Sequence, residues 1–251
     1  MLKNIGSIEN QGYELSIESD NLTGAFSWTT AFNIAFNRNK VLELGGEEYK
    51  EMAEGDGHLK TGSVRRLIVG EPIGVFYGYR FDGIFQNEEE CKQQTSSASP
   101  IGVGLRRYKD LNGDGKVDAA NDREILGDAN PKFFGGLTNT FAYKGFELNV
   151  FLQYSYGNKI LNYNAMELEN PTGGQNAYAD MVNRWTPENP SNIYPKATTN
   201  RALLVSDRFI EDGSYLKLKT LSLSYSFPKI NLKHIPDILS MLINFVQSHT
   251  D

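Results

Sequence analysis

A regular alternation of apolar and polar side chains limits the fold of this chain more than any other feature. Between residues 26 and 37, large apolar side chains occupy most even positions, and small or polar side chains occupy the odd ones. The even positions carry Phe26, Trp28, Thr30, Phe32, Ile34 and Phe36. Successive side chains of a β-strand point to opposite faces, so this period of two predicts a strand of about eleven residues. That length matches the ~9–11 residues with which a β-strand crosses a membrane.

Four further segments show the same alternation. They cover residues 13–17, 137–143, 146–156 and 221–227. In the third of them, Phe151 is a large apolar side chain on the otherwise polar face. Two residue pairs predict turns, Asp20–Asn21 after the first segment and Lys144–Gly145 between the second and the third. We therefore expect an antiparallel sheet whose strands are joined by short turns at one end.

The connections at the other end of the strands are long. They span residues 43–72, 86–131 and 158–212, and within them only residues 177–184 have the pattern of a short helix. Loops of this length without regular structure argue against a compact soluble domain. Short turns at one end and long loops at the other are typical of an outer-membrane β-barrel. A soluble antiparallel sandwich also alternates, although its strands usually have only about 5–6 residues.

The segment from residue 110 to residue 122 reads DLNGDGKVDAAND and has the spacing of a calcium-binding loop. Asp or Asn stands at places one, three, five and nine, and Gly115 stands at the sixth place, where such a loop turns sharply. The seventh place supplies a backbone carbonyl, and the twelfth, normally a carboxylate, is Asn121. A bulge at Ala119–Ala120 would bring the carboxylate of Asp122, one residue later, within reach of the calcium ion. The candidate calcium ligands are Asp110, Asn112, Asp114, Lys116, Asp118 and Asp122.

An alternative for the same loop needs no metal ion. Asp and Asn side chains readily accept hydrogen bonds from backbone N–H groups of their own turn, so an Asx-rich turn would explain the same residues. In both cases we expect the loop to stiffen a surface region. Calcium would therefore have a structural role, and we expect no other cofactor.

Charge and composition argue against several other functions. The net charge is −6, so we expect no basic surface for nucleic acid. The single cysteine, Cys91, excludes a disulfide within the chain. None of the three histidines pairs with a nucleophile, and the acidic run at residues 88–90 fits a solvated loop better than the acid and base of a glycosidase. We predict no catalytic residue.

Aromatic side chains in the long loops or at their margins suggest a further possibility. Tyr77, Tyr79, Tyr178 and Trp185 are of the type that stacks on sugar rings. Barrels also carry aromatic girdles whatever their substrate, so we expect packing or interfacial roles for these residues.

Several segments, in this order, resemble the SusC/RagA family of TonB-linked outer-membrane proteins. Two of them read RWTPENP, at residues 184–190, and EDGSYLKLK, at residues 211–219. The others lie at residues 4–15, 70–79, 82–87 and 110–131. The resemblance extends to about residue 228 and implies an all-β, antiparallel transmembrane barrel of 22 strands, closed by a plug.

The resemblance also implies a function. Members of this family import oligosaccharides, or in some cases peptides, across the outer membrane. They work with a SusD-like surface lipoprotein, and the TonB complex supplies the energy through the plug region. Outer-membrane lipid and a glycan or peptide substrate are therefore the expected partners, and the cell outer membrane is the expected location.

The chain matches only part of such a receptor. We expect residues 1–251 to form a partial barrel domain from its C-terminal portion, without plug, signal peptide or terminal strands, and with residues 86–131 as an extracellular loop. Residues 235–246 suggest one more strand. Because open sheet edges are not tolerated in lipid, we expect no functional channel from this chain alone. The alternative from another class is a soluble, calcium-stabilised β-sandwich that binds carbohydrate.

Overall fold

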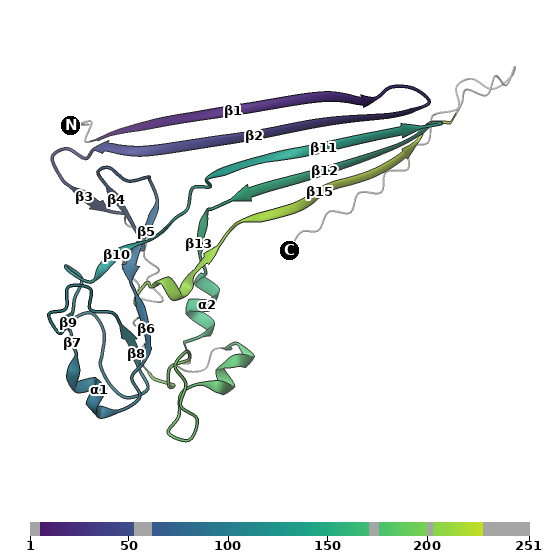
Figure 1. Cartoon of the computed structure of the whole chain (residues 1–251). Coiled ribbons are helices and arrows are strands. Elements are labelled where there is room, and N and C mark those ends of the chain that lie inside the picture. The colour runs from purple at the N-terminus through teal and green to yellow at the C-terminus, as the bar shows by residue number, and fades with distance from the viewer. Residues whose placement is uncertain (1–5, 53–61, 171–175, 200–202, 228–251) are drawn as a thin grey trace, which may run out of the picture. The chain divides into compact units, whose positions relative to one another are not determined.

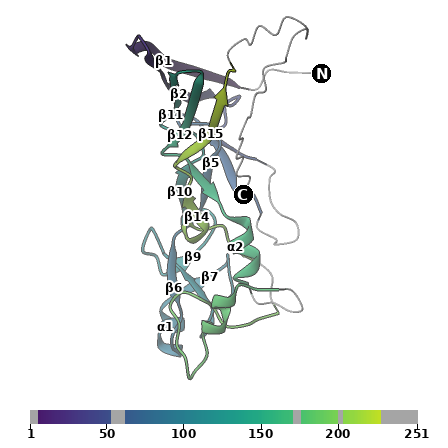
Figure 2. The ribbon, with the colours of Figure 1, turned by 90° about the vertical axis from the view of Figure 1, so that its right-hand side faces the viewer.

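The computed structural model describes residues 6–52, 62–170, 176–199 and 203–227, most of them in β-strands (Figures 1 and 2). The suggested strand at residues 235–246 lies outside these ranges. The chain forms two compact units. We call residues 11–38, 131–157 and 213–251 the sheet unit, and residues 1–10, 39–130 and 158–212 the loop unit.

Long antiparallel strands in the order β1-β2-β11-β12-β15 form a five-stranded sheet (Figure 1). They are β1 (Ser7–Leu22), β2 (Phe26–Glu43), β11 (Phe133–Tyr143), β12 (Phe146–Tyr156) and β15 (Tyr215–Tyr225). This arrangement confirms the antiparallel sheet that the alternation predicts. The first two strands, of 16 and 18 residues, are longer than expected. The turn predicted at Asp20–Asn21 is wrong, because both residues lie in β1 and the chain turns after Leu22.

The strand register gathers the apolar side chains on one face. Leu137 of β11 pairs with Phe32 of β2 and with Leu152 of β12, and Leu152 pairs with Leu218 of β15. The predicted hairpin between β11 and β12 is confirmed, with Lys144 and Gly145 both at positive φ (48° and 85°). Two successive positive φ angles are the signature of a type I′ turn, whose twist matches that of the two strands.

The loop unit contains regular structure that the sequence analysis missed. One sheet has the order β10-β5-β4-β3, and the strand pairs β6–β8, β7–β9 and β13–β14 form three smaller sheets. The strands are β3 (Tyr49–Glu51), β4 (Arg65–Ile68), β5 (Val75–Tyr79), β6 (Phe81–Ile84), β7 (Thr95–Ser96), β8 (Arg106–Tyr108), β9 (Lys116–Val117), β10 (Arg123–Asp128), β13 (Lys159–Leu161) and β14 (Ile210–Asp212). The expectation of long unstructured loops is therefore wrong.

Short helices complete the loop unit. They are α1 (Glu88–Gln93), α2 (Tyr163–Leu168) and the 3₁₀ helices η1 (Ala179–Asn183) and η2 (Asp207–Phe209). Only η1 falls where the sequence suggested a helix; the others have too few turns to show a period. Within the described part of the chain, no helix has both the length and the apolar character needed to cross a membrane.

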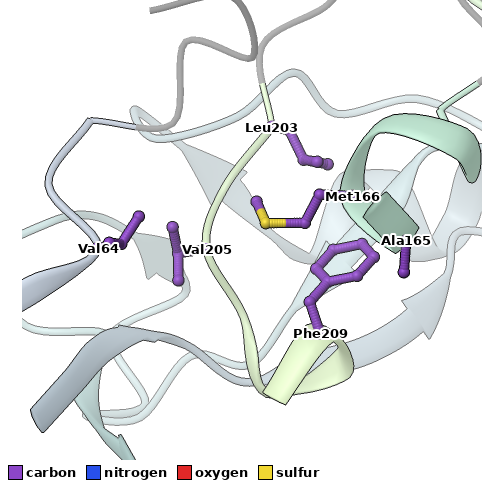
Figure 3. Close-up of a cluster of buried hydrophobic side chains, with 6 residues drawn as sticks. All are labelled: Val64, Ala165, Met166, Leu203, Val205 and Phe209. Carbon is purple, nitrogen blue, oxygen red and sulfur yellow. The ribbon is translucent and has the colours of Figure 1, made fainter. Parts of the chain in front are cut away.

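A small hydrophobic core holds the loop unit together. Figure 3 shows its central cluster, in which α2, η2 and loop residues bring apolar side chains together. The members are Val64, Ala165, Met166, Leu203, Val205 and Phe209. Met166 and Phe209 are almost completely buried, at 0% and 1% exposure. These side chains come from segments far apart in the sequence, so the cluster ties the long connections to one another.

Candidate functional site

The predicted calcium loop is a tight, internally hydrogen-bonded turn. The carboxylate of Asp110 accepts hydrogen bonds from the backbone N–H of Gly113 (2.7 Å) and of Gly115 (2.6 Å). Asn112 Oδ1 accepts from Asp114 N (3.2 Å), and Asp114 Oδ1 accepts from Lys116 N (2.8 Å). Gly115 has a φ of 81°, which is a conformation that glycine adopts without strain. The sharp turn expected at the sixth place is therefore present.

Asp122 closes this loop. Its side chain is fully buried, and its two carboxylate oxygens accept hydrogen bonds from Leu111 N and Asp118 N, each at 2.7 Å. Asp118 in turn accepts from the N–H groups of Ala120 and Asn121, both at 2.9 Å, which winds the chain between them. The structure thus brings Asp122 back to the loop, whereas Asn121, at the twelfth place, is exposed.

The loop could hold a hard cation only by combining carboxylate, amide and carbonyl oxygen atoms. Among the described residues, no group of three or more His, Cys, Asp or Glu side chains lies where it could hold a metal ion. A cation here would therefore need the Asn112 amide and the Lys116 carbonyl beside the carboxylates. Hydrogen bonds from Asn121 and Lys116 hold the pKa of Asp118 below its ordinary value, which keeps this carboxylate charged.

The acidic run of helix α1 has a structural role. Asn87 caps the helix by accepting a hydrogen bond from Glu90 N (2.9 Å), and Glu90 Oε2 accepts from Gln86 N (2.9 Å). Glu90 therefore accepts from the backbone of the residue before the cap and not from that of the cap itself, so the arrangement resembles a capping box shifted by one residue. Glu90 also pairs with Arg107 at 3.4 Å. Capping and pairing explain a carboxylate that would otherwise suggest acid–base chemistry.

Three of the four singled-out aromatic residues have packing roles. Tyr77 covers the guanidinium of Arg66 at 3.8 Å, and Tyr79 is buried against Tyr108 with ring centroids 5.7 Å apart. Burial raises the pKa of both buried tyrosines. The indole of Trp185 donates a hydrogen bond to Gln86 Oε1 (3.1 Å). The fourth, Tyr178, is 39% exposed.

The polar face of the five-stranded sheet contains a hollow that the sequence analysis did not identify. It has a volume of about 530 Å³, and its lining includes Glu14, Asn33, Gly136, Phe151 and Gln153. A Cβ atom on Gly136 would lie 2.7 Å from the Phe151 ring, so that ring lies directly over the glycine. Two sequence features could have indicated this hollow: the break in the alternation at Phe151 and the pair of glycines in the neighbouring strand.

A second hollow lies in the loop unit. Arg106 and Tyr108 line it together with mostly apolar neighbours, including Leu105 and Leu203. Arg106 Nη2 donates a hydrogen bond to the carbonyl oxygen of Glu169 (3.0 Å), while its Nε is buried without a partner among the described residues. Burial lowers the pKa of Arg106, and the hollow therefore combines apolar walls with one cationic group.

Comparisons with known proteins identify relatives of this chain. No family model matches it. The chain is 38% identical over 229 residues to TonB-dependent receptor P3 of Formosa agariphila. The aligned region covers 91% of the chain and 22% of that relative. It is 26% identical over 239 residues to TonB-dependent receptor SusC of Bacteroides thetaiotaomicron. That aligned region covers 92% of the chain and 22% of the relative.

A solved structure has the same fold. Against the RagAB peptide transporter the chain has a TM-score of 0.68 at 22% sequence identity, covering 90% of the chain and 24% of the solved chain. The fold is thus that of a barrel segment rather than of a soluble sandwich. The chain spans about a fifth to a quarter of the length of these relatives. It is therefore homologous to a segment of TonB-dependent receptors of the SusC/RagA type, and its long sheet is part of an outer-membrane β-barrel of that kind.

Proposed function

We propose that this chain forms part of the wall and the outer loops of a TonB-dependent importer that carries oligosaccharides or peptides across the outer membrane. One observation supports this function above all: four adjacent long strands, β2, β11, β12 and β15, share one register that separates an apolar face from a polar face. The apolar face suits lipid, and the polar face suits a hydrated lumen. The chain supplies a passage and its surface, so no catalytic residue is part of the proposal.

The proposed partners follow from the relatives. One of them is named SusC, and the matching solved structure is described as a peptide transporter. We infer that the whole receptor works with a SusD-like surface lipoprotein and draws energy from the TonB complex. Affinity purification of the tagged full-length receptor from outer membranes tests the first partner. Recovery of the receptor without any surface lipoprotein would contradict it.

Uptake measurements decide whether import takes place and which substrate class is carried. A strain that lacks the full-length receptor gene is compared with its complemented parent for uptake of fluorescent oligosaccharides and of fluorescent oligopeptides. We expect the deletion to abolish uptake of one class and a protonophore to abolish it in the parent. Unchanged uptake of both classes in the deletion strain would refute the proposed function.

A pair of substitutions on β12 tests whether the polar face lines the passage. Gln153 borders the hollow on the polar face, whereas Leu152 belongs to the apolar face. We expect Gln153→Trp to slow uptake severalfold in a receptor that reaches the membrane in normal amounts. Leu152→Trp adds a similar bulk to the other face and serves as the matched control. Equal uptake by the two variants would contradict a passage along the polar face.

We further propose that the loop of residues 110–122 binds calcium and is stiffened by it. Its support is the oxygen spacing and the return of Asp122 to the loop. Calorimetric titration of the full-length receptor with calcium should show saturable binding that Asp114→Ala abolishes. Asn121→Ala changes an exposed residue of the same loop outside the candidate ligand set and should bind as the wild type does. An unchanged titration of the Asp114→Ala variant would contradict the calcium site.

A further inference from the structure

The hollow of the loop unit lined by Arg106 and Tyr108, here called the Arg106 hollow, has an unbalanced positive charge at its wall. Two charged side chains, Arg208 and Glu169, lie close enough to act on the Arg106 guanidinium. The carboxylate of Glu169 is already paired with Arg208, because its Oε2 accepts hydrogen bonds from Arg208 Nε (3.0 Å) and Nη2 (2.6 Å). Two guanidinium groups thus share one carboxylate, and the three side chains together keep a net positive charge.

Hydrogen bonds within the loop unit use little of the Arg106 guanidinium. An arginine side chain offers five N–H donors in a planar fork. Among the residues that the structure describes, Arg106 makes a single hydrogen bond, from Nη2 to the carbonyl oxygen of Glu169 at 3.0 Å. Its Nε is buried and has no partner in that part of the chain. Donors therefore remain free at the outer end of the fork, on Nη1 and Nη2.

Burial makes this unbalanced charge costly. It is the main reason that the pKa of Arg106 lies below its ordinary value. A buried charge normally has a partner of opposite sign, because the protein interior replaces little of its hydration. Tyr108 does not supply that partner, since burial raises the pKa of its phenol and keeps it neutral. The stretches that follow Asn170 and precede Leu203 in the chain, residues 171–175 and 200–202, contain no Asp or Glu. An anion bound in the hollow would balance the charge.

The size and the walls of the Arg106 hollow indicate what kind of anion fits. Its volume is about 90 Å³. At ~10–15 Å³ for one water-sized group, this leaves room for about six to nine such groups, roughly one amino-acid residue. The walls are mostly apolar, with Pro100, Leu105 and Leu203 among them, and would leave the hydroxyl groups of a sugar acid without partners. Uncharged polar residues of the lining, such as Ser99 and Asn170, suit the amide group of a peptide.

We propose that the Arg106 hollow binds the C-terminal residue of a peptide, with the terminal carboxylate on the Arg106 guanidinium and an aliphatic side chain against the apolar walls. A guanidinium fork and a carboxylate match in shape, so that two parallel N–H···O hydrogen bonds form between them. The inference rests on the proposed import function, whose substrate class it narrows to peptides that end in a free aliphatic residue.

Two forms of one peptide test this site. Calorimetry measures how the full-length receptor in detergent binds the acetylated peptide AAAAL with a free carboxylate and with a C-terminal amide. We expect the amide to bind about tenfold more weakly, because it loses hydrogen bonds between charged groups. Arg106→Gln should bind both forms equally. Arg107→Gln is the matched control and should keep the preference for the acid, since Arg107 is paired with Asp82 (2.9 Å) and Glu90 (3.4 Å). Equal binding of acid and amide by the wild type would overturn the proposal.

Competition on the wild-type receptor avoids dependence on the folding of any variant. We expect 4-methylpentanoate, which carries a carboxylate on a short aliphatic chain, to displace the peptide acid, and 4-methylpentanamide to leave it bound. Displacement by galacturonate oligomers in place of the aliphatic acid would assign the hollow to an acidic sugar and refute the peptide site.

Peptide uptake by cells, measured in parallel, separates this site from the import function. A preference for the acid without uptake would support the site and contradict import, whereas uptake without that preference would refute the site alone.

Discussion

The sheet unit and the loop unit exclude water in different ways. Every buried hydrophobic side chain of the described residues belongs to the loop unit, whereas the sheet unit leaves large apolar side chains open, with Tyr13 79% and Leu216 71% exposed. A sheet of this kind is stable where lipid covers its apolar face and further strands cover its edges. The comparison shows that one chain is adapted to two solvents, with a core of its own only in the part that meets water.

The largest expected effect contrasts a core residue with a membrane-facing residue. Phe209→Ala removes a ring that is 1% exposed, and the cavity left behind should cost about 3–5 kcal/mol in the loop unit. Leu223→Ala, on the apolar face, leaves a space that lipid fills, so only the transfer term of about 1–2 kcal/mol remains. Hydrogen exchange of the full-length receptor in lipid reports both as local opening. Equal effects of the two variants would contradict the division into two solvents.

Asp122→Ala should produce the next largest effect. It removes the acceptor for two backbone N–H groups, those of Leu111 and Asp118, around a side chain that is fully buried. Leaving buried donors without partners should cost about 3 kcal/mol. Asn121→Ala, next in the chain and exposed, should cost less than about 0.5 kcal/mol. Hydrogen exchange at residues 110–122 measures both, and similar protection in the two variants would show that Asp122 does not hold the loop.

Gly135→Ala tests packing within the sheet rather than burial. A Cβ atom on Gly135 would lie 2.1 Å from the carbonyl oxygen of Asn33 and 2.6 Å from the hydroxyl of Tyr154. That hydroxyl crosses the glycine to donate a hydrogen bond to the same oxygen at 2.8 Å. We expect the strands to separate locally at a cost of about 1–3 kcal/mol, measured by urea unfolding in detergent. Ala31→Val, at an exposed position of β2, is the control and should be nearly neutral.

The smallest expected effect is a pH dependence of the loop unit. Burial raises the pKa of Glu51, but the hydrogen bond from Arg66 and the charge of Arg123 outweigh burial, so the folded pKa lies below its ordinary value. Stability from this carboxylate is present above its unfolded pKa of about 4.3 and is lost as the pH falls through the lower folded pKa. Because Glu51 is more than a third exposed, we expect less than about 1 kcal/mol.

Glu51→Gln provides the check on this pH dependence. The substitution removes the titrating group and keeps a side chain of similar size. Thermal unfolding is compared between about pH 7 and pH 3, a range that includes the unfolded pKa of a glutamate. The difference between wild type and variant should shrink at the acidic end. A constant difference over the whole range would show that the charge of Glu51 does not contribute.

The sequence by itself determined the type of sheet and which of its faces is apolar. The period of two specifies both, because alternate side chains of a strand must point to opposite sides. It predicted β12 to the residue, since the apolar face of that strand keeps its character along its whole length and only Phe151 interrupts the polar face. It underestimated β1, which extends from Ser7 to Leu22, because the alternation there is clear only at residues 13–17. It also located the calcium-type loop from the spacing of its oxygens.

The tertiary structure alone decided how distant segments meet. The core around Phe209 joins residues from 64 to 209. No local pattern of apolar residues in the sequence predicts contacts between segments so far apart. The return of Asp122 to Leu111 depends on how the intervening turn winds, which the spacing left open. The placement of Leu137 between Phe32 and Leu152 follows from the strand register. Short-range sequence patterns predict which face of a strand a side chain occupies, but contacts between strands and loops form only when distant segments come together in the folded chain.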